Sequence, residues 1–339
     1  MKNWKKTGLT ALAGSLVAFS ANAGEMSVSG SANLTYTANT GQEDAASNSN
    51  NTDIGMDGSR WGMARSLTFS GSGEMDNGWT VTVSQTIANG ATTAHGITLD
   101  MGDMGSLNYE NSTGSRGIGK IADMLPAADE DAGNGLDTNG SATGSGISGK
   151  VSGGVKGFHY SKAVDMVEIG LGYAPKGGAN VGNGGTSGTG GNASSVGGFI
   201  KVDPMDGLEI GAGWGEVANA TSGNEGQTDD HETYYASYVW GPVTVAYQYS
   251  EIDVYNSSSD SENEAVGILY AVNDELSISY QDRTNEVAGN TVDEEISGWS
   301  AAYTMGSMTF KMHSNQGDGM DNTVSQESEH TEVGVTFAF

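Results

Sequence analysis

The last ten residues, His330–Phe339 (HTEVGVTFAF), decide how the rest of the chain is interpreted. Their side chains alternate with the period of a β-strand that has two different faces. One face carries Val333, Val335, Phe337 and Phe339. A soluble protein that ended on such a strand would expose an apolar face and an open hydrogen-bonding edge. A strand that closes a barrel in lipid has a partner on both edges and hydrocarbon for its apolar face.

The same alternation recurs along most of the chain, in segments of about ten residues, the length that crosses a bilayer as a tilted strand. Clear examples are Glu25–Thr37, Trp79–Ile87, Leu276–Arg283 and Met308–Asn315. The second face of each segment carries Ser, Thr, Asn, Gly or charged residues. Short turns alternate with longer polar loops, among them 89–93 and 112–153. The pattern predicts an all-β fold, a transmembrane antiparallel β-barrel of about 16 strands with short periplasmic turns and long external loops.

The first 23 residues have the composition of a secretory signal peptide rather than of a strand. Lys2, Lys5 and Lys6 precede the apolar stretch Gly8–Ser20. Ala21 and Ala23 then supply the small side chains of a cleavage site, so we expect cleavage after Ala23. The barrel domain is accordingly predicted over 24–339. No later apolar run is long enough to cross a bilayer as a helix.

The composition excludes several classes of function. The formal net charge is −28, which argues against a nucleic-acid partner and favours cations as companions. The sequence has no cysteine, so it has no disulfide, thiolate metal site or cysteine nucleophile. Neither a G-x-S-x-G elbow nor His at metal-ligand spacing is present, and we predict that the chain is not an enzyme and has no cofactor.

Three stretches resemble the general diffusion porins of Gram-negative bacteria: Arg65–Thr86, Met101–Asn111 and the terminal VGVTFAF. The resemblance implies a homotrimer in the outer membrane, surrounded by lipid, whose water-filled channel passes ions and small hydrophilic solutes. It also implies that the third external loop, 112–153, folds into the channel. The residues Val333, Val335, Phe337 and Phe339 would then be the assembly signal that the barrel-assembly machinery reads.

The candidate constriction combines acids of this loop with bases that strand parity directs into the lumen. The acids are Asp123, Asp129, Glu130 and Asp131, and the bases are Lys201, Arg283 and Lys311. Opposed acids and bases across a pore would create a transverse field that orients polar solutes. The excess of loop acids predicts a preference for cations. The sequence departs from the family in lacking the compact acidic motif of enterobacterial third loops, and strand parity directs Arg65 toward lipid.

Three alternatives remain open at this stage. The barrel could be selective for one class of solute, or the chain could be an exported acidic, β-rich surface or adhesion protein built as a soluble β-sandwich. Oxygen ligands at Asp318 and Asp321 offer a weak candidate for structural Ca²⁺, although their spacing is not that of an EF-hand.

Overall fold

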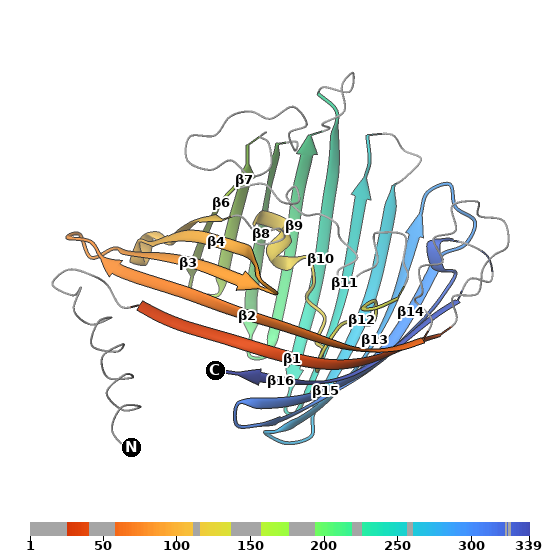
Figure 1. The fold of residues 1–339 in the computed structure, drawn as a ribbon. Helices are drawn as coiled ribbons and strands as arrows, with labels where there is room; N and C mark the ends of the chain where they lie inside the picture. The colour runs from red at the N-terminus through yellow and green to blue at the C-terminus, as the bar shows by residue number, and fades with distance from the viewer. Residues whose placement is uncertain are drawn as a thin grey trace, which may run out of the picture.

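The computed structural model describes residues 26–40, 58–110, 116–136, 157–175, 194–218, 226–255, 260–322, 324 and 327–339. Within these ranges, sixteen strands form one closed barrel in which each strand pairs with its neighbours in sequence and β16 pairs with β1 (Figure 1). All the pairings are antiparallel. The predicted fold class is confirmed. The expected signal peptide and its cleavage residues Ala21 and Ala23 lie outside the described residues.

The strands are β1 (Met26–Thr40), β2 (Gly58–Glu74), β3 (Thr80–Ala88), β4 (Ala91–Asp100), β5 (Ser106–Glu110), β6 (Gly157–Val164), β7 (Val167–Ala174), β8 (Ser195–Met205), β9 (Leu208–Ala218), β10 (Thr228–Trp240), β11 (Val243–Asp253), β12 (Ser261–Ala271), β13 (Leu276–Val287), β14 (Glu294–Met305), β15 (Met308–Asp318) and β16 (Glu327–Ala338). Three short 3-10 helices are η1 (Gly102–Met104), η2 (Gly117–Ile121) and η3 (Met320–Asn322). No helix among the described residues is long and apolar enough to cross a membrane.

The two faces of each strand have the polarity expected for a barrel in lipid. On β13, Ile278 and Tyr280 are exposed on the outer face, whereas Gln281 and Arg283 are buried on the inner face. Exposed apolar and buried polar side chains are the reverse of a soluble β-sandwich, in which the apolar faces meet in a core. The alternative of a soluble surface protein is therefore wrong.

The short connections are tight turns whose residues suit them. The turn between β3 and β4 consists of Asn89 and Gly90 alone, at φ values of +50° and +89°. Asn and Gly tolerate positive φ, which two-residue hairpin turns require. The expectation of a longer loop over 89–93 is wrong because β4 already begins at Ala91.

The ends of the chain close the barrel. The N–H of Phe339 donates to the carbonyl of Gly30 at 3.0 Å, and the N–H of Gly30 donates to the carbonyl of Phe339 at 2.8 Å. Leu34 pairs in register with Val335 in the middle of the same ladder. β1 and β16 consequently lie side by side, as Figure 1 shows, and neither leaves an open edge there.

Candidate functional site

Part of the connection between β5 and β6 lies inside the barrel. We call residues 116–136, the described part of this connection, the inner loop. Its 3-10 helix η2, yellow in Figure 1, lies against β7, β8 and β9. Ile118 and Ile121 are fully buried there, and Ile121 packs with Phe199 and Tyr235 of the wall. Burial of these side chains anchors the first half of the inner loop by the hydrophobic effect.

Glycine allows the inner loop to touch the wall with its backbone. A Cβ atom at Gly172 of β7 would lie 2.5 Å from the backbone nitrogen of Gly117. Gly117 itself has a φ of +51°, and a Cβ on it would lie 2.8 Å from the carbonyl carbon of Gly197. Neither position has room for a side chain, so two strands and η2 meet through backbone atoms.

Three amide side chains of the wall bind the backbone of the inner loop: Gln248, Gln281 and Asn315. The Oε1 of Gln248 accepts a hydrogen bond from the N–H of Met124 at 2.8 Å, and its Nε2 donates to the carbonyl of Ile121 at 3.0 Å. Gln281 and Asn315 bind further backbone groups along the loop. A segment without regular secondary structure needs such partners for its buried backbone groups. The sequence analysis missed these amides, although their strand parity directs all three inward.

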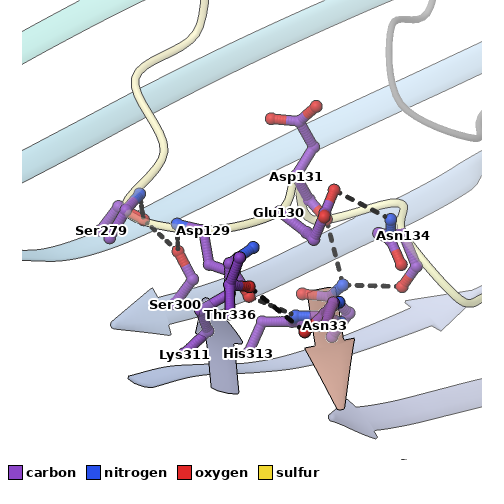
Figure 2. Close-up of polar contacts among 12 residues, drawn as sticks. Asn33, Asp129, Glu130, Asp131, Asn134, Ser279, Ser300, Lys311, His313 and Thr336 are labelled. Atoms are coloured by element: carbon purple, nitrogen blue, oxygen red, sulfur yellow. Dashed lines mark hydrogen bonds and ion pairs between the residues drawn. The ribbon is translucent and has the colours of Figure 1, made fainter. Parts of the chain in front are cut away.

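Asp129 binds two side chains of β15. Its carboxylate forms an ion pair with the Nζ of Lys311 and lies 3.1 Å from the Nδ1 of His313, as Figure 2 shows. The N–H of Asp129 donates to the Oγ of Ser300 on β14 at 3.0 Å. Burial raises the pKa of the Asp129 carboxyl, but the hydrogen bonds from His313 and Lys311 outweigh it and hold the pKa below its usual value. The side chain is only 3% exposed, so its negative charge acts on Lys311 and His313 of the wall rather than on the lumen.

Asp123 and Asp131 form an acidic pair within the inner loop. Burial and a hydrogen bond with the Asp131 carboxyl raise the pKa of Asp123 to about 8, although nearby Arg283 opposes the shift. The Nε2 of Gln281 donates to the Oδ1 of Asp131 at 3.1 Å. The Asp123 carboxyl is therefore largely protonated near neutral pH.

Lys311 and Arg283 lie in the part of the barrel wall on which the inner loop rests, rather than across the lumen from the loop acids. Lys311 contacts Asp129, and Arg283, 2% exposed, interacts electrostatically with Asp123. The expected transverse arrangement is therefore wrong for Lys311 and Asp129. The inner loop lies on the wall that carries this base, because contact at hydrogen-bond distance stabilises opposite charges far more than separation across water.

Lys201 does not join the loop acids. Its Nζ lies 2.9 Å from the Oε2 of Glu168 and 3.7 Å from the Oε2 of Glu209, on the neighbouring strands β7 and β9. The hydroxyl of Tyr235 donates to the Oε1 of Glu209 at 2.6 Å. This cluster belongs to the wall near the short turns, away from the inner-loop acids.

A different wall of the lumen, formed by β1 to β5, is rich in hydroxyl groups. Ser31 and Ser66 share a hydrogen bond of 3.0 Å, and Thr68 and Thr86 share one of 2.8 Å. These pairs join adjacent strands on the inner face. The lumen thus combines a charged wall that holds the loop with a wall whose strands are joined by pairs of hydroxyl groups.

Of the two candidate calcium ligands, only Asp318 has a described side chain. Asp318 is exposed at the end of β15, and the side chain of Asp321 lies outside the described part of the structure. No group of three or more His, Cys, Asp or Glu residues within the described ranges is placed to hold a metal ion. Calcium binding at this pair stays a prediction.

Comparisons with known proteins agree with the architecture. A family model described as Gram-negative porin matches residues 8–339. A porin structure refined at 1.8 Å superposes with a TM-score of 0.65 at 13% identity, covering 93% of this chain and 100% of that one. OmpF of Salmonella typhi in complex with daunomycin gives 0.65 at 16%, covering 93% and 98%.

OmpT of Vibrio cholerae, folded in vitro, gives a TM-score of 0.63 at 12% identity, covering 93% of this chain and 98% of that one. At such low identity these structural likenesses support the fold alone. A search among curated proteins found no matching sequence. The family match across nearly the whole chain, together with the closed barrel, shows that the chain belongs to the Gram-negative porins, outer-membrane channels for passive diffusion.

Proposed function

We propose that this channel prefers cations among the ions and small hydrophilic solutes that it passes. The observation that carries the proposal is the ion pair between the inward base Lys311 and Asp129 of the inner loop. A base that is compensated at contact distance presents little net positive charge to the lumen, and Arg283, which acts electrostatically on Asp123, is only 2% exposed. The chain as a whole carries a net charge of −28, so the remaining field is negative.

The test is the reversal potential of the purified channel in a planar bilayer under a salt gradient. The expected sign corresponds to cation flow, and the magnitude should fall as salt screens the lumen charges. A reversal potential of the opposite sign would overturn the proposal. Adding neutral sugars or phosphate in the same experiment tests the alternative of a solute-selective channel, which would show saturable block of the current.

We further propose that the protein assembles as a homotrimer through the outer face of β2 to β5. Arg65 points outward beside Met63 and Leu67, and Gln85 and His95 pair in register on the same face. An arginine on the lipid face of a barrel costs about 2–4 kcal/mol near the bilayer midplane. Contact with another copy of the chain would remove this cost.

The substitution Arg65→Glu tests the contact face. We expect the variant to dissociate to monomers in detergent at a temperature at which the wild type stays oligomeric on unheated gels. Asp282→Asn, on the outer face of β13, is the matched control and should leave the oligomer unchanged. An oligomer equally stable in both variants would place the contact elsewhere.

A further inference from the structure

The four acids of the inner loop are not electrostatically equivalent. Asp129 is paired with Lys311 and His313, and Asp123 shares a hydrogen bond with Asp131 near Arg283. Asp129 is thus compensated by a base, and Asp123 and Asp131 lie near another. Glu130 differs, because its side chain is exposed and accepts a hydrogen bond from the neutral amide of Asn134 at 3.2 Å (Figure 2). No base among the described residues forms an ion pair with this carboxylate.

A second carboxylate, Glu332, stands at the same level of the wall. It lies on the inner face of β16, in register with His313 of β15 and Thr37 of β1. Electrostatic interactions link it first to His313 and then to Asp129, Glu130 and Lys311. On the other side of Thr37, the inner face of β2 carries the base Arg60, in register with Thr37. Since Asp129 already compensates Lys311, the pair does not cancel Glu332. The terminal strand thus contributes a charge beside the one that the inner loop exposes.

We propose that Glu130 and Glu332 together determine the ion selectivity of the channel, whereas Asp129 positions the inner loop. This inference rests on the proposed cation preference and specifies its origin. Two adjacent carboxylates in a narrowed, water-filled lumen concentrate cations and repel anions. Lys120, the exposed base of the inner loop, acts in the opposite direction.

Reversal potentials of a set of conservative variants test the assignment. We expect Glu130→Gln and Glu332→Gln each to lower the cation-to-anion permeability ratio by about twofold, and the double variant to bring it near unity. Lys120→Gln should raise the ratio. Asp129→Asn combined with Lys311→Gln removes both charges of the ion pair and so leaves the net charge of the lumen unchanged, and this double variant should increase current noise through a less firmly held loop while shifting the ratio less than Glu130→Gln does.

The outcomes separate this inference from the proposed function. A cation-selective wild type whose double variant keeps the wild-type ratio overturns the inference and leaves the proposed function intact. A larger loss of selectivity in the charge-balanced double variant of Asp129 and Lys311 than in Glu130→Gln also overturns it. A wild type that prefers anions overturns the proposed function itself.

A second measurement does not depend on the glutamine variants. The chain has no cysteine, so Glu130→Cys creates a single thiol. A cationic thiol reagent added to the open channel should react with it and lower the permeability ratio below that of the unmodified variant, whereas an anionic reagent should restore it. A thiol at this position that fails to react would show that residue 130 does not face the lumen.

Discussion

Asp129 of the inner loop and Lys311 of β15 form an ion pair although 182 residues separate them in the chain. His313, two residues farther along β15, holds the other oxygen of the same carboxylate. An ion pair between residues so far apart in the chain forms only when the last strands of the barrel are in place. The pair therefore couples the position of the inner loop to completion of the barrel.

Asp129→Asn should weaken this coupling. The variant keeps the shape of the side chain but leaves Lys311 without its anion, and we expect a loss of about 1–3 kcal/mol, reduced from the cost of breaking a fully buried pair because Lys311 is partly exposed. Thermal unfolding in detergent micelles, followed by mobility on gels, measures the change. Asp103→Asn in the exposed turn η1 is the control, and equal melting of the two variants would contradict the prediction.

Gly172→Ala should displace the inner loop from the wall. The added Cβ would lie 2.5 Å from the backbone nitrogen of Gly117, which cannot move without shifting η2. Overpacking of this kind costs about 1–3 kcal/mol. We expect a noisier channel of altered conductance. Gly73→Ala is the matched control, since nothing lies within 4 Å of its added Cβ. Wild-type conductance in Gly172→Ala would show that η2 tolerates the displacement.

Raising the pH should loosen the inner loop. The pKa of Asp123 is raised from 3.8 to about 8, so the docked loop favours its protonated form. This stabilisation of the docked state is complete only below the ordinary pKa and is lost as pH rises from there through about 8. Current noise in the wild type should therefore rise as pH increases toward 8 and level off above it.

Asp123→Asn isolates the contribution of this proton. The amide keeps a hydrogen-bond donor toward Asp131 and does not titrate, so we expect the rise in noise with pH to disappear. A variant whose noise follows the wild-type pH profile would assign the transition to another group.

Phe339 offers a way to separate barrel closure from assembly. Its backbone N–H and carbonyl both bind Gly30, whereas its ring is 69% exposed. Phe339→Ala keeps these backbone hydrogen bonds, and deletion of the residue removes them. If the ring is read as an assembly signal, both variants should insert poorly in cells, but Phe339→Ala should still fold when refolded in detergent. Normal insertion of Phe339→Ala would contradict a role for the ring.

The alternation of apolar and polar residues was enough to predict the barrel, because one face of a membrane-spanning strand contacts lipid and the other contacts the water of the lumen. It also predicted that Arg283 and Lys311 point inward. The same reasoning located the acids of the inner loop but placed their partners across the lumen. Strand parity predicts the direction in which a side chain points. It does not predict which distant segment of the chain that side chain contacts.

The sequence by itself therefore determined the sheet, its closure through Phe339 and the faces of its strands, since these follow from local periodicity and hydrogen-bonding requirements. Only the tertiary structure decided that the inner loop lies on the β7–β15 wall, that Lys201 pairs with Glu168, and that Glu332 lies in register with His313, whose ring contacts Asp129 beside Glu130. The reason is physical: the path of a loop depends on whether its backbone groups find partners such as Gln248 and whether glycine leaves room, and both conditions arise from strands far apart in the chain.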